Sequence, residues 1–263
     1  MGQLFGNDNS RIAIERNFGH QPVSVVAGPS HIGKMEFVSE LARSRVHETD
    51  LFVADCSIGS AREAIQFAAS RPAFSTTRVI IVDGAHSLSE PAQDAYLKLC
   101  EEPPDFLRLY FVAEDSDILL PALRSRFTQV HRWSRLRHEE ILAFINADSL
   151  CPDEEAGHLC FGAPGLYRTI ASSPGLKSLY REILSFFKGQ SDPILTPTPE
   201  VLAELKEDLK RDSVINICRR AFSDMRASGI DCHKLLPLSN FASVLHRYPS
   251  ANAEVYWARC LLV

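Results

Sequence analysis

One short stretch, residues 23–34, limits the folds open to this chain more than any other. Val23–Ala27 is a continuous apolar run, as expected of a parallel strand that is buried on both faces. It leads into a loop of the form G-x-x-x-x-G-K that ends at Lys34, and a segment with apolar residues at helical spacing follows. Strand, glycine loop and helix in this order are the context of a phosphate-binding loop. The stretch therefore predicts an α/β fold.

The position after this lysine departs from the phosphate-loop pattern. A serine or threonine is expected there, because its hydroxyl binds magnesium, but this chain has Met35. A thioether cannot replace that hard oxygen ligand. Gly28, Gly33 and Lys34 can therefore bind phosphate without a complete magnesium site, or the two glycines can serve only a tight strand-to-helix turn.

A second apolar strand ends in an acid. Val79–Val82 are four consecutive β-branched residues, and Asp83 follows them. An acid at this place can hold magnesium in nucleotide-hydrolysing proteins, and it can equally cap the next turn. In ATP-hydrolysing proteins of this architecture the following residue is a glutamate that polarises the attacking water, whereas here it is Gly84. Together with the loop at Gly28, this pattern favours a nucleotide fold with incomplete catalytic residues.

Strand and helix signals alternate over the first half of the chain, which predicts a parallel sheet with helices on both faces. Further predicted strands are Leu51–Ala54, Leu107–Ala113 and Val130–Trp133. The predicted helices are Ser10–Phe18, Ile58–Ala69, Glu90–Glu101 and Leu119–Leu123, with Ser10 and Ser89 as N-caps. Glu114 and Asp115 end one strand where an active nucleotide site would place a polar group near the γ-phosphate, and two acids there would repel phosphate.

Past Trp133 the composition becomes helical. Helical segments are predicted at Arg137–Ala147, Asp153–Phe161, Leu166–Ser172, Leu179–Phe187, Ile215–Met225 and Glu254–Leu262. The stretch GQSDPILTPTP has three prolines and is the best linker candidate, and its last two residues, Thr198 and Pro199, can start a helix. The predicted regions are a nucleotide-fold domain at 1–134, a helical lid at 135–188, a linker at 189–198 and a C-terminal helical collar at 199–263.

Charge and cysteine usage exclude several classes of protein. The 263 residues carry a formal net charge of −5, so no overall basic field indicates nucleic-acid binding. Arg219, Arg220 and Arg226 can contact DNA or acidic partners, but they are most simply a solvated face. No apolar run is long enough for a membrane span, and the polar start is no signal peptide. The seven cysteines include no CxxC pair, and Cys151, His158 and Cys160 make no closed metal site. We expect a cytoplasmic, reduced protein.

Three stretches between Ser57 and Arg126 carry a more specific signal. They are SIGSAREAI at residues 57–65, VIIVDGAH at 79–86 followed by a helix ending in LKLCEEPP, and LLPALRSRF at 119–127. These stretches resemble the AAA+ clamp-loader family, most closely the delta-prime subunits of bacterial DNA polymerase III. The last stretch is similar to the segment that ends in the family's SRC motif, with Phe127 in place of the cysteine. With the loop at Gly28 and the lid, the resemblance extends over the region before the linker.

The resemblance implies roles for individual residues. In that family, AAA+ subunits form an open five-membered ring with ATP between subunits, and the ring opens a sliding clamp and places it on primer–template DNA. The SRC arginine acts on the ATP of a neighbouring subunit, a role that passes to Arg126. Lys34 and Asp83 occupy the Walker A and Walker B positions, in which the family binds ATP.

Several family features are missing or displaced in this chain. Met35 and Gly84 replace the magnesium ligand and the catalytic glutamate, and no set of zinc-binding cysteines precedes Val79. The lid turn at 162–165 lacks an arginine at the expected sensor position, unless Arg168 serves from an offset site. The C-terminal helices match the family's oligomerising collar only in their placement.

The resulting prediction is a clamp-loader subunit without ATPase activity of its own, which completes a neighbour's ATP site through Arg126. Whether ATP still binds at Gly28, Gly33, Lys34 and Asp83 stays open, and no metal is expected. The implied partners are other clamp-loader subunits in a hetero-oligomer, a pentamer in the family, together with a sliding clamp and primer–template DNA, with no membrane involved. The alternative is an active AAA+ ATPase subunit like the small subunits of replication factor C, and a P-loop kinase is weaker because nothing resembles an acceptor-substrate site. A bacterium and a virus replicating in host cytoplasm are both open as the source.

Overall fold

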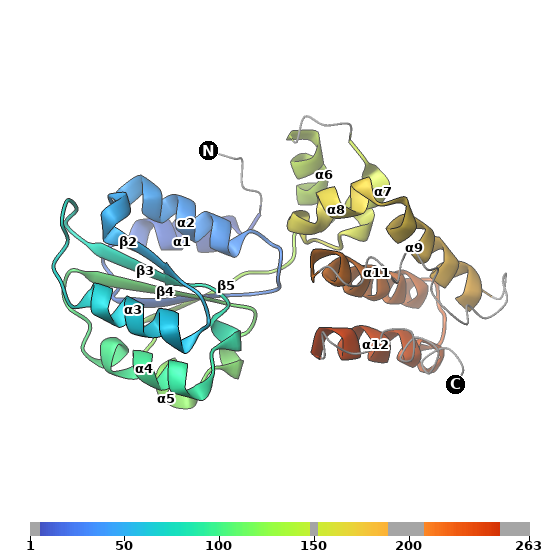
Figure 1. Ribbon diagram of the computed structural model, residues 1–263. Coiled ribbons are helices and arrows are strands. Elements are labelled where there is room, and N and C mark those ends of the chain that lie inside the picture. The colour runs from blue at the N-terminus through green and yellow to red at the C-terminus, as the bar shows by residue number, and fades with distance from the viewer. Residues whose placement is uncertain (1–5, 148–151, 189–207, 248–263) are drawn as a thin grey trace. The chain divides into compact units, whose positions relative to one another are not determined.

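Five strands form one fully parallel sheet, in the order β2-β3-β4-β1-β5 (Figure 1). The strands are β1 (Val23–Ala27), β2 (Leu51–Ala54), β3 (Arg78–Val82), β4 (Leu107–Ala113) and β5 (Gln129–Arg132). The computed structural model describes residues 6–147, 152–188 and 208–247. It divides into two units, Met1–Arg135 and Leu136–Val263, and the sheet lies in the first. The chain winds from β1 to the β2 edge and back to β4, and it then crosses to β5, so the topology switches direction beside β1.

Helices cover both faces of this sheet, as predicted (Figure 1). Helices α1 (Asp8–Asn17) and α2 (Lys34–Arg45) lie on one face, and α3 (Ile58–Ala68), α4 (Glu90–Glu101) and α5 (Pro121–Arg124) lie on the other. Short 3-10 turns η1 (Glu48–Asp50), η2 (Ala85–Ser87) and η3 (Ser116–Ile118) join them to the strands. The predicted α/β class with a parallel sheet is confirmed.

The core lies on both sides of the central strands. Every residue of β1 and β3 is buried, and all of them except Ser24 and Arg78 are apolar, because alternate side chains point to opposite faces and both faces are covered. On one face Phe111 packs edge-on against Tyr96 of α4, with ring centroids 5.4 Å apart. On the other face Tyr110 stacks on Phe18, with centroids 5.7 Å apart. Neighbouring residues of β4 thus anchor the two helical layers.

The predicted N-caps of two helices need correction. Helix α1 begins at Asp8, two residues before the predicted start, and the hydroxyl of Ser10 donates to the carbonyl of Arg132 at 3.2 Å instead of capping. Ser89 does stand at the N-cap position of α4, but its side chain makes no capping hydrogen bond. Both serines were chosen by residue type alone, and a hydroxyl can bond to a strand carbonyl as well as to a helix start.

The helix predicted at Leu119–Leu123 is also wrong in its bounds. Helix α5 is a four-residue turn at Pro121–Arg124. Proline lacks an N–H and suits the first helical position, so Pro121 sets the start and Leu119 and Leu120 stay outside. Leu119 and Leu123 are nevertheless buried in the core, as an apolar run predicts. Strand β5 begins and ends one residue earlier than predicted.

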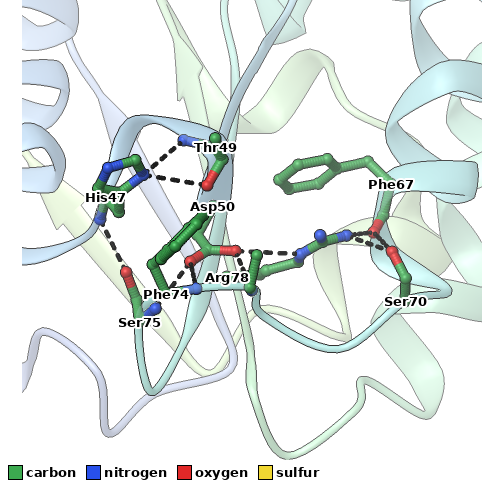
Figure 2. A network of polar contacts seen from close by, with 9 residues as sticks. His47, Thr49, Asp50, Phe67, Ser70, Phe74, Ser75 and Arg78 are labelled. Carbon is green, nitrogen blue, oxygen red and sulfur yellow. Dashed lines mark hydrogen bonds and ion pairs between the residues drawn. The ribbon is translucent and has the colours of Figure 1, made fainter.

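A buried carboxylate fixes the loop between α3 and β3, as Figure 2 shows. Asp50 is fully buried and accepts hydrogen bonds from the backbone N–H groups of Ala73, Phe74 and Ser75 at 2.7, 2.9 and 2.8 Å. Burial would raise the pKa of Asp50, but these donors outweigh it and lower the pKa to about 2. Nε of Arg78 lies 3.6 Å from the same carboxylate. The start of β3 is therefore tied to the segment before β2.

The second unit is helical. It contains α6 (His138–Ala147), α7 (Glu154–Leu159), η4 (Pro164–Leu166), α8 (Tyr167–Ser172), α9 (Pro174–Phe187), α11 (Asp208–Ala227) and α12 (Cys232–Arg247). Helix α11 packs against α8, α9 and α12. Its buried side chains include Val214, Ile217 and Ala221, which recur at helical spacing. None of the described helices has both the length and the apolar composition of a membrane span.

Two predictions for this unit need correction, and others lie outside the described residues. Pro174 begins α9 instead of separating two helical segments, since proline is tolerated in a first turn. Helix α12 lies in the region that was predicted to be helical, but no bounds were predicted for it, because its apolar residues are interrupted by Pro237 and short polar residues. The linker at 189–198, the helix start at Thr198 and the helix at Glu254–Leu262 lie outside the described residues. The division into lid and collar stays a prediction.

Candidate functional site

The glycine loop after β1 is built by close backbone contacts. A Cβ on Gly28 would lie 2.4 Å from the carbonyl oxygen of Trp133, so only glycine fits there. The N–H of Trp133 in turn donates to the carbonyl of Ala27 at 2.7 Å. Gly33 caps α2 with φ 88°, a left-handed conformation that favours glycine. The two predicted glycines thus shape the turn from strand to helix.

The lysine of this loop folds back onto the loop itself. Lys34 is buried, and its Nζ donates to the carbonyl oxygens of Gly28 at 2.6 Å and Pro29 at 2.5 Å. Burial lowers the pKa of Lys34 to about 8, against the opposing charges of Glu114 and Asp83. The ammonium group therefore stabilises the curled backbone, and it would have to leave at least one carbonyl to contact a phosphate.

The end of β3 brings Asp83 to the same edge of the sheet. Asp83 is exposed, and its Oδ1 accepts from the N–H of Gly84 at 2.8 Å. Gly84 has φ 63°, and a Cβ built on it would meet nothing within 4 Å. A side chain at this position would thus find space, but it would strain the backbone. Met35 is the second residue of α2 and is partly buried.

The end of β4 places one acid toward the loop and turns the other away. The N–H of Glu114 donates to Nδ1 of His86 at 3.2 Å, and Nε2 of His86 lies 3.9 Å from Oε1 of Glu114. Glu114 is also the acid that most raises the pKa of Lys34. Asp115 caps η3 by accepting from the N–H of Asp117 at 2.9 Å. Of the two predicted acids, Glu114 is therefore the one whose charge acts on Lys34 of the loop.

Arg126 lies near the amino ends of the strands, whereas Lys34 and Asp83 lie at their carboxyl ends. The N–H of Thr128, two residues later, donates to the carbonyl of Val23, the first residue of β1. Lys34 and its carbonyl partners follow Ala27, the last residue of that strand. At about 3.3 Å per residue the strand alone separates the two edges by roughly 13 Å. The structure therefore brings Lys34 and Asp83 together and keeps Arg126 apart from them.

Two ion pairs with the same geometry flank the short helix α5. Nη2 of Arg126 lies 2.7 Å from Oε1 of Glu101, the last residue of α4. Nη2 of Arg124 lies 2.8 Å from Oδ1 of Asp117 in η3. Both arginine side chains are 42% exposed. The predicted arginine is thus accessible from outside the chain, although it is already hydrogen-bonded.

Two residues of α4 that contact the segment around α5, Gln93 and Glu101, were not predicted from the sequence. Gln93 is buried, its Nε2 donates to the carbonyl of Leu88, and its Oε1 accepts from the N–H of Leu120 at 2.7 Å. It therefore holds the segment that leads into α5. Its position beside Ala92 on the inward face of α4 was a signal, because a buried amide must find partners. Glu101 gave no such signal, since acids at helix ends are usually solvated.

A pocket of about 580 Å³ opens beside Asp83. It is lined by Phe52, Val53, Ala54, Asp55, Ser57, Gly59, Ser60, Glu63 and Asp83, from β2, the start of α3 and the end of β3. Three of these residues are acids, so the pocket is negative. A phosphate chain would be repelled there, which leaves the loop at Gly28–Lys34 as the better place for an anion.

In the second unit, a polar cluster joins three helices. Oδ2 of Asp224 in α11 lies 2.9 Å from Nε2 of His158 and 2.6 Å from the hydroxyl of Tyr180, and Arg220 donates to it at 3.0 Å. The prediction that Arg220 lies on a solvated face is therefore wrong, because the guanidinium completes a partly buried charge pair. His158 and Cys160 lie in and beside α7 but form no metal site; Cys151 lies outside the described residues. No group of three His, Cys, Asp or Glu in the described ranges could hold a metal ion.

Arg168, the offset sensor candidate, is an exposed residue of α8. It belongs to the second unit, whereas the loop at Gly28 belongs to the first. Its role as a sensor stays a prediction.

The sequence matches known proteins over part of its length. Residues 53–134 match the family model described as "DNA polymerase III, delta subunit". DNA polymerase III subunit gamma/tau of Mycobacterium bovis and of Mycobacterium tuberculosis is 38% identical over 69 residues, which are 26% of this chain and 12% of that protein. The chain thus aligns with about an eighth of the length of these curated relatives.

Solved structures extend the similarity of fold to nearly the whole chain. A DNA polymerase III gamma subunit-related protein from Thermotoga maritima has a TM-score of 0.51 and 14% identity, covering 96% of this chain and 97% of that one. A RuvB variant from Thermotoga maritima has a TM-score of 0.50 and 15% identity, covering 94% and 86%. At these identities the structures establish the fold.

Proposed function

We propose that this chain is a member of the AAA+ clamp-loader family and serves there as a delta-prime-like subunit. In this proposal it does not hydrolyse ATP itself. It supports the loading of a sliding clamp and supplies Arg126 to the ATP site of a neighbouring subunit. Arg126 would act there as an arginine finger, which stabilises the charge that develops on the γ-phosphate.

The position of Arg126 carries this proposal. Arg126 is partly exposed beside the amino edge of the sheet, whereas Lys34 and Asp83 lie at the carboxyl edge. A guanidinium at this place is too far from the chain's own phosphate loop to contact a nucleotide bound there. It can serve a phosphate only when another molecule presents it, which is what a finger in trans requires.

The residues at the chain's own loop do not fit magnesium-dependent hydrolysis. Met35 offers no hydroxyl to magnesium, and Gly84 has no side chain to polarise water. The left-handed conformation of Gly84 also explains why a glutamate would be poorly tolerated there. Gly28, Gly33 and Lys34 fit an anion better than a magnesium complex, so we propose a degenerate ATP site and derive no catalytic step from it.

The proposed partners follow from this role. They are other clamp-loader subunits in a hetero-oligomer, a pentamer by analogy with the family, together with a sliding clamp and primer–template DNA that the complex contacts. We propose that such a complex acts in the cytoplasm. DNA binding by the complex should weaken as salt rises, because phosphate contacts release counterions.

The test is ATP turnover by the complex purified with its native partners, with partners identified by mass. Arg126→Ala should lower the turnover by about 10³-fold or more at the site that receives the finger. The turnover that remains at the other sites sets the upper limit of the loss measured for the whole complex. Unchanged turnover in a fully assembled Arg126→Ala complex would contradict the proposal that Arg126 acts on the neighbour's ATP.

A second candidate, an active ATPase subunit, is favoured by the retention of Lys34 and Asp83 at one edge of the sheet. It requires magnesium-dependent ATP hydrolysis by the isolated protein. If such hydrolysis is found and Lys34→Met abolishes it, the second candidate replaces the first.

A further inference from the structure

Glu101 holds the guanidinium of Arg126 in a defined place. Its Oε1 accepts from Nη2 of Arg126 at 2.7 Å, and the hydroxyl of Ser125 accepts from Nη1 at 3.2 Å. The side chains of Arg126 and Glu101 are 42% and 47% exposed. The arginine is therefore oriented by two neighbours while one side of it stays open to another molecule.

The local charges favour this arrangement. Glu101 and Glu102 stand at the carboxyl end of α4, where the partial negative charge of the helix already disfavours acids. Arg126 is the only cation that forms an ion pair with Glu101 among the residues that the structure describes. Moving the guanidinium away would leave the acid uncompensated. Arg126 is thus held at the end of α4 before any partner arrives.

Holding Arg126 in this way leaves it able to bind phosphate. A guanidinium has five N–H groups, and the contacts to Glu101 and Ser125 use two of them. Three remain, and two parallel N–H groups are enough for a bidentate contact with a phosphate. The carboxylate therefore orients the arginine without competing for all of its donors. A long side chain that is already oriented loses less rotamer freedom when it engages its target.

We propose that Glu101 is a positioning residue, which presents Arg126 to the ATP of the neighbouring subunit. This inference rests on the proposed function, because it needs Arg126 to be the finger. Glu101 itself contacts no phosphate. It limits the directions in which the guanidinium can point, so that the arginine is already oriented when it contacts the γ-phosphate.

The expected effect is smaller than the effect of losing the arginine. Exposed ion pairs contribute little, so removing the charge of Glu101 should lower turnover at the site that receives Arg126 by about two- to fivefold. The loss should fall on kcat and leave the KM for ATP nearly unchanged, because a finger acts more strongly on the transition state than on bound ATP. A merely structural role would instead alter assembly or thermal stability.

The experiment compares Glu101→Gln with Arg126→Ala in the complex with its native partners, measuring kcat and KM for ATP. The matched control is Asp117→Asn, because Asp117 pairs with Arg124 at 2.8 Å beside the same short helix and with the same arginine exposure. A double variant, Glu101→Gln with Arg126→Ala, adds a further test. Its turnover should equal that of Arg126→Ala alone, since Glu101 is proposed to act only through Arg126.

We expect Glu101→Gln to lower kcat at the site that receives Arg126 about two- to fivefold, Asp117→Asn to match the wild type, and assembly to be intact in both. If Arg126→Ala lowers turnover while Glu101→Gln equals or exceeds the wild type, the role of Glu101 is overturned and the proposed function stands. A further loss in the double variant would likewise overturn it. If Arg126→Ala itself leaves turnover unchanged, the proposed function fails, and this inference fails with it.

Discussion

Single residues at the glycine loop show how far local sequence can predict a site. The order of Gly28, Gly33 and Lys34 was enough to predict a curled loop between a strand and a helix, because each has a conformational or charge requirement at fixed spacing. The requirement for glycine at position 28 was not predictable, because it arises from close contact with the carbonyl of Trp133, which is far along the chain. The folding of Lys34 onto two loop carbonyls was also not predictable.

Replacement of Gly28 by alanine should destabilise the first unit. The added Cβ would lie 2.4 Å from a backbone oxygen that cannot move without distorting β5 and its continuation. We expect a loss of about 1–3 kcal/mol, as for overpacking in a tight site. Urea denaturation followed by circular dichroism measures it.

Gly59 offers the matched control. It lies in the first turn of α3, and the atom nearest to a Cβ added there would be 3.9 Å away. Gly59→Ala should leave stability unchanged or raise it by up to about 1 kcal/mol, because alanine favours the helix. Equal stability of Gly28→Ala and the wild type would contradict the close contact at Trp133.

Elements were predicted best where apolar residues form an uninterrupted pattern. The bounds of β1, β2 and β4 agree with the prediction, because a short run of almost entirely apolar residues is typical of a strand in a parallel sheet. Contacts between elements could not be predicted. Arg126 and Glu101 are 25 positions apart, and Leu120 and Gln93 are 27 apart, so only the packing of α4 beside α5 brings them together.

The segment between α3 and β3 depends on a buried contact that the sequence did not reveal. Arg78 donates from Nη1 to the carbonyl of Phe67 and to the hydroxyl of Ser70, and its guanidinium lies 4.2 Å from the ring centre of Phe67 (Figure 2). Asp50 faces the same arginine and three loop N–H groups. An acid in a polar stretch normally indicates solvent exposure, whereas here it joins η1, the loop and β3.

Asp50→Asn should therefore destabilise the first unit by about 3–5 kcal/mol, because it leaves Arg78 without its buried countercharge. The pKa of Asp50 is lowered to about 2 in the folded state. A lowered pKa gives stability that is present above the unfolded value near 4 and is lost as pH falls toward about 2. The wild type should lose this part of its stability between about pH 4 and 2, and the variant should not.

Urea denaturation at several pH values measures both effects. Asp94→Asn is a suitable control, because Asp94 is exposed on α4. The control should behave like the wild type. The same pH dependence in Asp50→Asn and in the wild type would show that another carboxylate is responsible.

At the scale of the whole molecule, two units with separate cores share one chain. The fold class and the resemblance to the clamp-loader family were predictable from sequence, since both depend on motifs in the first unit. The second unit has no comparable motif, and its central polar cluster was not predicted. Residues from α7, α9 and α11 meet in this cluster, which joins segments on both sides of the predicted linker.

Asp224→Asn should loosen the second unit and leave the first intact. Burial raises the pKa of Asp224, but Tyr180, His158 and Arg220 outweigh it, so the pKa is lowered and the carboxylate stabilises the fold above its unfolded pKa. We expect a loss of about 1–3 kcal/mol at neutral pH, which falls as the pH drops below about 4. Hydrogen exchange, resolved by peptide, measures each unit separately.

In that measurement α9 and α11 should exchange faster and the strands of the sheet should not. Glu139→Gln, at an exposed position of α6, is the control and should not change exchange in either unit. Faster exchange in the sheet of Asp224→Asn would contradict two separately stabilised units.

We propose that this chain acts on the ATP of a neighbouring subunit and does not hydrolyse ATP at its own site. The most direct measurement is single-turnover ATP hydrolysis by the complex with its native partners, comparing Arg126→Ala with Lys34→Met. We expect Arg126→Ala to slow hydrolysis at one site by about 10³-fold or more, and Lys34→Met to leave all rates near the wild type. Slow hydrolysis in Lys34→Met together with a normal rate in Arg126→Ala would contradict this proposal.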